Sequence, residues 1–157
     1  MKKDSIFVAI DDSKRTLVIG VLRPGSQEPE VHSIPNEPRH LRRHLERLRR
    51  EGDIRVCYEA GPTGFGLCRR LREAEIDCIV VAPSLVPGKP GDRVKTDRRD
   101  ARKLAHFLRS GDLTQVYVPE ESVEAIRDLE RARDDAKCAE RVARHQLSKF
   151  VTVHTPG

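Results

Sequence analysis

The apolar segments of this chain of 157 residues follow one another in an order that few folds can accommodate. Three short apolar segments, at residues 6–11, 16–22 and 30–34, follow one another with only turns between them. Two more, at residues 54–58 and 77–82, are each preceded by a segment of helical periodicity. Short apolar runs rich in Val and Ile predict buried strands. The sequence therefore predicts three strands in succession, followed by strands that alternate with helices.

The helical segments lie at residues 36–51, where leucines recur every three or four positions, and at about 62–75. Strands joined by turns pair antiparallel, whereas strands joined through a helix pair in parallel. We therefore predict an α/β fold with a mixed sheet: three antiparallel strands, then β/α crossovers, with helices on its flanks. This is the strand order of a ribonuclease-H-like fold.

In the last third of the chain, the residue pattern predicts a helix over 97–109, an edge strand over 114–118 and a long charged helix over 119–150. A charged helix of this length at the end of a domain often continues into a coiled coil. We accordingly expect a catalytic domain at 1–118, a helix that starts a coiled-coil linker at 119–150, and an atypical tail at 151–157.

Four carboxylates occupy positions that such a fold could bring to one place. Asp11 ends the first predicted strand and Glu59 directly follows the fourth, while Asp97 and Asp100 lie at the predicted start of a helix. Residues three apart lie on the same side of a helix, so the latter pair could share a metal ion. Carboxylate oxygens suit Mg²⁺ or Mn²⁺, and two such ions can drive phosphodiester displacement. We predict that these four acids are catalytic residues and metal ligands, binding two ions.

Three of the four acids also have a purely structural interpretation. Asp11 could simply end a strand in a turn, because the Asp-Asp-Ser-Lys sequence favours turns, although strand alternation makes Asp12 the better turn residue. Asp97 and Asp100 could be acids stabilised by the dipole of a first helical turn. It is their joint placement, with Lys89, Arg93 and Lys95 nearby to neutralise phosphates, that favours the functional interpretation.

The charge balance points to a polyanionic partner. Lys and Arg number 30 against 25 Asp and Glu, giving a formal charge of +5, an excess that fits DNA or RNA. The densest basic run, residues 39–50, is equally compatible with a solubilising surface and with nucleic-acid contact. Aromatic residues make up only 4%, which leaves no stacking platform for single strands. His40 and His44 are four residues apart but lack the Glu of a zinc-binding H-E-x-x-H motif, so we interpret them as structural.

The cysteine pattern and the hydropathy of the sequence indicate where in the cell the protein is located. Cys57, Cys68, Cys78 and Cys138 form no CxxC pair and no zinc-ribbon spacing, which predicts reduced intracellular thiols. The N-terminus has no signal-peptide pattern, and no segment reaches the roughly 20 apolar residues of a membrane span. We expect a cytoplasmic protein with no membrane partner.

Several stretches resemble one family closely: AIDDSK at 9–14, YEAGPTG at 58–64, VAPS at 81–84, KPGDRVKTDRRDA at 89–101 and HQLSKF at 145–150. They resemble the N-terminal domain of the insertion-sequence transposases of the IS110 family, also called DEDD transposases, a domain that is similar to the RuvC Holliday-junction resolvase. The resemblance covers about residues 5 to 150. By it, the four acids of the family fall on the same four residues chosen above, Asp11, Glu59, Asp97 and Asp100.

The resemblance implies Mg²⁺-dependent DNA strand cleavage and exchange in transposition, with guidance by a non-coding RNA. Basic residues within these motifs are then expected to bind nucleic acid: Lys14, Lys89, Arg93, Lys95, Arg98 and Arg99. The long final helix, whose apolar stripe is short and rich in Ala, favours a homodimer through this helix. We expect association with the nucleoid when the protein is bound to DNA.

Two departures from the family qualify what it implies. Asp12 stands where the family has an apolar residue, and residues 151–157 do not resemble the family's continuation into a domain with a catalytic serine. We therefore expect recombination by this polypeptide alone to be incomplete. Two alternatives stay open: a stand-alone structure-selective nuclease, and a non-catalytic nucleic-acid-binding remnant. A sugar kinase or actin-like ATPase is excluded because no Gly-rich phosphate turn follows Asp11.

Overall fold

The computed structural model describes residues 5–61, 64–82 and 97–154. The chain divides into two compact units, Met1–Val118 and Pro119–Gly157. The first unit contains a five-stranded sheet with three helices, and the second contains one long helix. Among the described residues, no helix has both the length and the apolar character that crossing a membrane requires.

The sheet has the strand order β3-β2-β1-β4-β5. β1 pairs antiparallel with β2, and β2 pairs antiparallel with β3, whereas β4 is parallel to both β1 and β5. The predicted mixed sheet, with a meander followed by crossovers, is therefore confirmed. The strands are β1 (Ile6–Asp12), β2 (Thr16–Leu22), β3 (Glu30–Pro35), β4 (Ile54–Glu59) and β5 (Asp77–Val81).

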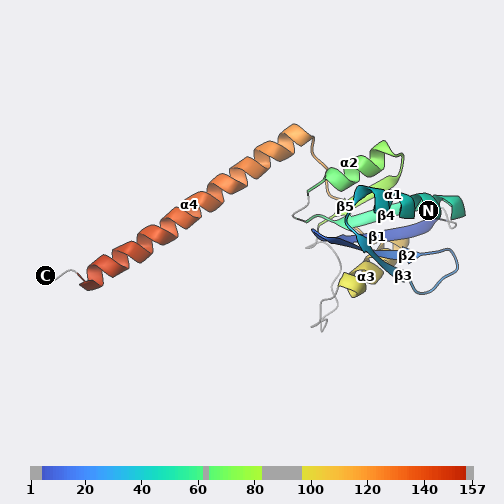
Figure 1. The fold of residues 1–157 in the computed structure, drawn as a ribbon, viewed down its shortest axis with the longest axis horizontal. Coiled ribbons are helices and arrows are strands. Elements are labelled where there is room, and N and C mark those ends of the chain that lie inside the picture. Colours follow the sequence, from blue (N-terminus) through green and yellow to red (C-terminus); the bar gives the residue numbers. More distant parts are fainter. Residues whose placement is uncertain (1–4, 62–63, 83–96, 155–157) are drawn as a thin grey trace. The chain divides into compact units, whose positions relative to one another are not determined.

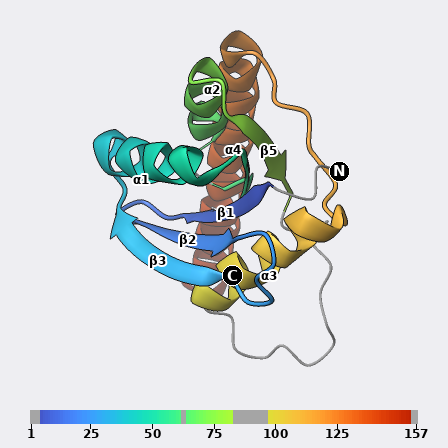
Figure 2. The same ribbon diagram turned by 90° about the vertical axis from the view of Figure 1, so that its right-hand side faces the viewer.

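Helices cover both faces of the sheet in the first unit (Figures 1 and 2). α1 (Pro38–Glu51) and α2 (Gly66–Glu73) pack on one face, and α3 (Asp97–Ser110) packs on the other. In the second unit, α4 runs from Glu121 to His154, which is longer than the predicted helix, and none of its residues is buried.

Strand alternation divides the core into two layers. In β1, Ile6, Val8 and Ile10 face the layer that contains the leucines of α1 and α2. Phe7 and Ala9 face the layer that contains Leu104, Ala105 and Leu108 of α3. β1 is almost entirely buried because both of its faces are covered. The aliphatic character of the core follows from a sequence with few aromatic residues.

Two predicted elements differ from the structure. α2 begins at Gly66 rather than near residue 62 and ends at Glu73, with Glu75 in the left-handed region (φ 56°). Residues 114–118 form no strand: their only pairing with β5 is a single bridge between Val81 and Gln115. Two apolar side chains of this segment pack against the core, and Pro119, which has no N–H to donate, follows directly.

β2 and α3 approach each other at a single glycine. A Cβ atom on Gly20 would lie 2.6 Å from the backbone oxygen of Ala101. Both residues are buried, and the atoms of α3 nearest to this position belong to the helix backbone. The absence of a side chain at Gly20 therefore sets how closely α3 packs on the sheet.

We predict that Gly20→Ala destabilises the fold, because the new methyl group must push a helix backbone away from the sheet. The expected loss is about 1–3 kcal/mol in the free energy of unfolding, measured by urea denaturation. Gly66→Ala is the matched control, since the nearest atom to its added methyl group would be the tip of the Arg70 side chain at 3.7 Å. Equal stability of the two variants would contradict this account of the helix–sheet contact.

His44 lies on a flank of α1, with its ring centroid 5.2 Å from that of His32 in β3. Nearby, Arg23 binds both Glu51 (2.7 Å) and Glu30 (2.9 Å), linking the end of β2 to the end of α1. Burial lowers the pKa of His44 to about 4, and the positive charges of His32, Arg47 and Arg23 act in the same direction, partly opposed by Glu51. His44 is therefore neutral in the folded protein at neutral pH.

A histidine whose pKa is lower in the folded state contributes stability that is present above its unfolded pKa of 6.5 and is lost as the pH falls toward 4. We predict that the parent loses about 1–3 kcal/mol of unfolding free energy over this interval, because partial exposure weakens the full linkage effect. In His44→Gln, the free energy of unfolding should change less between pH 6.5 and about 4.5 than it does in the parent. This interval lies above the pH range in which the carboxylates bound to Arg23 titrate, because their pKa values are lowered.

The exposed His145 in α4 provides the control for this measurement. His145→Gln should leave the pH profile of denaturant unfolding unchanged. An unaltered profile in His44→Gln would assign the pH dependence to other groups.

Candidate active site

The parallel pairing of β1 and β4 places two of the predicted acids next to each other. Ile10 is in register with Tyr58, so Asp11 and Glu59 are the next residues of two neighbouring strands. Because side chains alternate along a strand, both acids lie on the same face as Ala9 and Cys57, the face that α3 covers. Both are partly exposed, as is expected at the carboxyl end of a strand.

Asp12 serves the opposite face. Its Oδ1 accepts a hydrogen bond of 2.8 Å from Nδ2 of Asn36, and the same Asn36 nitrogen donates to the backbone oxygen of Ser13 (2.7 Å). The side chain of Asp12 therefore joins the β1–β2 turn to the segment between β3 and α1. It is directed away from the face that carries Asp11, which keeps the two adjacent carboxylates apart.

The direction of α3 brings the other two acids toward the same edge. Ala101 lies over Gly20 in the middle of β2, and Arg109 Nη1 donates a hydrogen bond of 2.7 Å to the backbone oxygen of Ser26, beyond the end of β2. Since β2 runs antiparallel to β1, the end of α3 lies where β1 begins. The start of α3 is therefore directed toward the edge where β1 ends.

Asp97 and Asp100 lie in the first turn of α3. Each precedes a buried residue by four positions, Asp97 before Ala101 and Asp100 before Leu104, so both continue the stripe of α3 that faces the sheet. Asp100 is partly exposed and Asp97 is exposed. The topology thus brings all four acids to one edge of the sheet, from two strand ends and one helix start.

The structure does not gather these side chains into a ligand shell. Among the residues that it describes, no three His, Cys, Asp or Glu side chains lie close enough together to hold one metal ion. The assignment of Asp11, Glu59, Asp97 and Asp100 as metal ligands and catalytic residues therefore stays a prediction. Their chemistry fits the predicted ions, because the set consists only of hard oxygen donors.

The residues that follow Glu59 are held by two contacts that the sequence analysis did not identify. The backbone N–H of Ala60 donates to the oxygen of Val81 (2.7 Å), which continues the β4–β5 pairing past Glu59. The hydroxyl of the buried Tyr58 donates to the backbone oxygen of Gly64 (3.2 Å). A Tyr in an otherwise apolar strand needs a partner for its hydroxyl, and this was the available signal.

Burial also determines the state of the groups around Glu59. It raises the pKa of both Tyr58 and Cys57, and the charge of Glu59 raises that of Cys57 further. Neither group therefore ionises near neutral pH, so neither is available as a base or as a thiolate. All four cysteines are free, as the sequence predicts, with Cys138 exposed and the other three buried.

The predicted nucleic-acid-binding residues are placed only in part. Lys14 is exposed in the turn between β1 and β2, at the edge where β1 ends. Arg98 and Arg99 are exposed in the first turn of α3. Lys89, Arg93 and Lys95 lie outside the described residues. The cations that are described thus belong to the same edge of the sheet as the four acids.

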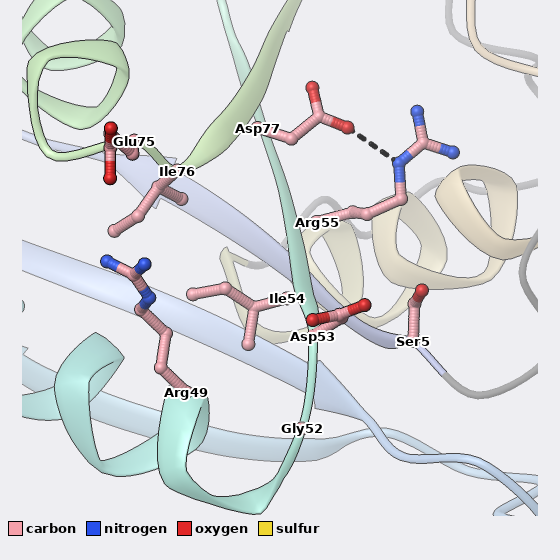
Figure 3. A pocket seen from close by; sticks show the side chains of 9 residues that line it. All are labelled: Ser5, Arg49, Gly52, Asp53, Ile54, Arg55, Glu75, Ile76 and Asp77. Atoms are coloured by element: carbon pink, nitrogen blue, oxygen red, sulfur yellow. Dashed lines mark hydrogen bonds and ion pairs between the residues drawn. The ribbon is translucent and has the colours of Figure 1, made fainter.

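The opposite edge of the sheet, where β4 and β5 begin, carries a hollow of about 530 Å³ (Figure 3). Its basic and acidic groups partly neutralise each other, since Arg55 binds Asp77 at 2.8 Å. None of the predicted site residues lines it, and we interpret it as a structural feature. The lining residues are Ser5, Arg49, Gly52, Asp53, Ile54, Arg55, Glu75, Ile76 and Asp77.

Comparison with known proteins identifies the family. The family model DEDD_Tnp_IS110, described as a transposase, matches residues 8–156. A putative transposase, y4qE, of Sinorhizobium fredii is 46% identical over 152 residues, which cover 94% of this chain and 39% of the relative. The transposase for insertion sequence element IS1533 of Leptospira borgpetersenii is 35% identical over 152 residues, covering 95% of this chain and 44% of the relative.

The chain therefore spans less than half the length of either of these relatives. The match nevertheless includes both strand ends and the helix start that carry the four acids. This chain belongs to the IS110 family of transposases.

Proposed function

We propose that this chain supplies the metal-binding carboxylates of a DNA strand-cleavage and strand-exchange site, in a RuvC-like DEDD domain. The observation that supports it is the topology: Asp11 and Glu59 end neighbouring parallel strands, and the helix that starts with Asp97 and Asp100 runs back along the same face. Open α/β sheets bind ligands at the carboxyl ends of their strands, which is the edge occupied here.

Two Mg²⁺ or Mn²⁺ ions, when bound, would stabilise the attacking and leaving oxygens of a phosphodiester displacement. The protein contributes rigidity to this site. Asp11 and Glu59 lie on strands fixed by pairing on both sides, whereas Asp97 and Asp100 extend from a helix anchored by Ala101 against the sheet. Lys14, Arg98 and Arg99 are then positioned to neutralise phosphates of DNA at the same edge.

The partners of the proposed reaction are DNA, a guide-type non-coding RNA and a second copy of the chain, and the proposed location is the cytoplasm, at the nucleoid. Self-association through α4 is supported by large apolar side chains that are exposed along this helix. These are Val123, Ile126, Leu129, Val142, Leu147, Phe150, Val151 and Val153.

Complete transposition draws on more than the matched region, because both relatives are more than twice as long as the part that this chain matches. The catalytic serine that the family resemblance implies belongs to that additional part. We therefore propose that the described domain binds the metal ions and the nucleic acid, and that strand exchange requires the serine-bearing part as well.

A calorimetric titration with Mn²⁺ tests the metal site. We expect saturable binding to the parent that weakens at least about tenfold in Asp11→Asn, because a ligand carboxylate is replaced by a neutral amide. Asp12→Asn is the matched control: it removes the same charge one residue away, on the opposite face, and keeps the oxygen that accepts from Asn36. Its Mn²⁺ binding should equal that of the parent.

Incubating the same samples with branched DNA distinguishes a stand-alone nuclease from a domain that needs the additional part and from a non-catalytic binding remnant. Mn²⁺-dependent nicking by the parent that disappears in Asp11→Asn would favour a stand-alone nuclease. Metal binding without nicking would support the need for the additional part. Equal Mn²⁺ affinity in the parent and Asp11→Asn, with and without DNA, would overturn the assignment of Asp11 and favour a non-catalytic binding remnant.

A further inference from the structure

The outer side of α1 carries a ridge of three exposed arginines, Arg43, Arg47 and Arg50. Their spacing of four and then three residues places them in one row along the helix. The row lies on the side of α1 opposite Leu41, Leu45 and Leu48, which are buried against the sheet. We call these three residues the arginine ridge.

The arginine ridge is weakly neutralised within the described part of the chain, where Arg23 and, to a smaller extent, the charge of Arg47 lower the pKa of the Glu51 carboxyl. There, Arg43, Arg47 and Arg50 form neither a hydrogen bond nor an ion pair through their side chains. The two glutamates of α1 are engaged elsewhere: Glu46 lies 3.7 Å from Arg42, and Glu51 binds Arg23 at 2.7 Å. Three like charges at this spacing weaken a helix slightly, and only Arg50, in the last turn, is favoured by the helix dipole.

α4 shows how this chain builds a solvated charged helix. Three of its five arginines form ion pairs with acids three or four residues away: Arg131 with Asp128 (3.0 Å), Arg133 with Glu130 (3.0 Å) and Arg144 with Glu140 (2.8 Å). Such pairs are typical of a solubilising surface. The arginine ridge lacks them, which favours an anionic partner over solubility.

The neighbouring surface extends the positive charge. A groove of about 200 Å³ between α1 and α2 has an apolar floor that includes Leu45 and Leu71. Three arginines (Arg42, Arg49 and Arg70) and two glutamates (Glu37 and Glu46) line it, which leaves a small positive excess. Figure 2 shows α1 and α2 together on the face of the sheet opposite α3. The arginine ridge is therefore separate from the face that carries the four acids.

We propose that the arginine ridge binds the phosphate backbone of duplex DNA, as a docking surface distinct from the acidic edge. This inference rests on the proposed function. From Arg43 to Arg50 the helix rises about 10 Å, and a duplex carries one phosphate charge every ~1.7 Å of axis, so a segment of this length presents several phosphates to the three arginines. The ridge has no aromatic side chain on which single-stranded bases could stack.

The course of α1 relates this surface to the proposed site. The segment before α1 is tied to Asp12 at the edge where β1 ends, through Asn36, and α1 ends beside the start of β4 at the opposite edge. DNA bound along the ridge would thus extend from the catalytic edge toward the other end of the sheet. The ridge would contact the phosphate backbone of the substrate and would therefore not recognise its base sequence.

The salt dependence of duplex binding tests this surface. With Arg43, Arg47 and Arg50 all replaced by Ala, the slope of log K against log[salt] should fall by about 2.7, and affinity at about 0.1 M salt should fall at least tenfold. The control replaces Arg131, Arg133 and Arg144 by Ala, which removes the same charge from paired positions and should change the slope by less than about one. Fluorescence anisotropy in EDTA measures both without metal chemistry.

A third variant, with Lys at the same three ridge positions, should restore the slope, because phosphate neutralisation needs the charge rather than the guanidinium shape. Ala and Lys are both good helix formers, so α1 should persist at these exposed positions, as circular dichroism would show.

The outcomes separate this inference from the proposed function. If the Ala variant had the same slope of log K against log[salt] as the parent, the proposal that the arginine ridge binds DNA would be wrong. The result of the Mn²⁺ titration would be unaffected. A selective loss of binding to an RNA hairpin, with duplex DNA binding unchanged, would overturn DNA as the occupant. A parent that binds no DNA at any salt concentration would overturn both.

Discussion

β1 and β4 pair in parallel although two strands and a helix lie between them in the sequence. Their register makes Asp11 and Glu59 neighbours, because each is the residue after the last matched pair. Parallel pairing also fixes the face: one residue of slippage would turn either side chain to the other side of the sheet. The burial of both faces of β1, under α1 and α2 on one side and α3 on the other, holds this register.

The sequence predicts the sheet because each strand has a strong local pattern of short apolar runs separated by turns or helices. The positions of Asp11 and Glu59 follow from those patterns alone. The approach of Ala101 to Gly20 could not be predicted, since a strand glycine does not indicate which distant backbone will pack on it. For the same reason, the sequence predicts that Asp97 and Asp100 begin a helix but not which edge of the sheet that helix approaches.

The prediction of a strand at residues 114–118 was wrong although the local sequence pattern was present. The alternating pattern is strong, but strand formation requires continued pairing with a neighbour, and the segment makes a single bridge to β5. The hydroxyl of Tyr58 is a further case in which the need for a partner is visible in the sequence and the partner, the oxygen of Gly64, is visible only in the fold.

The two adjacent aspartates show how one strand serves both layers. Asp11 belongs to the face covered by α3, while Asp12 binds Asn36 and so helps fix where α1 begins. The same strand end therefore sets both the proposed catalytic edge and the start of the helix that carries the arginine ridge.

The four acids share one edge of the sheet with the exposed Lys14, Arg98 and Arg99, and a row of arginines without ion pairs follows the outside of α1. A polyanion such as DNA is repelled by carboxylates that bind no metal ion and attracted by arginines that form no ion pair. A separate basic surface would thus hold DNA close to the acids before bound metal ions neutralise them. This division would allow a chain with a modest net charge of +5 to combine the proposed acidic site with the proposed DNA substrate.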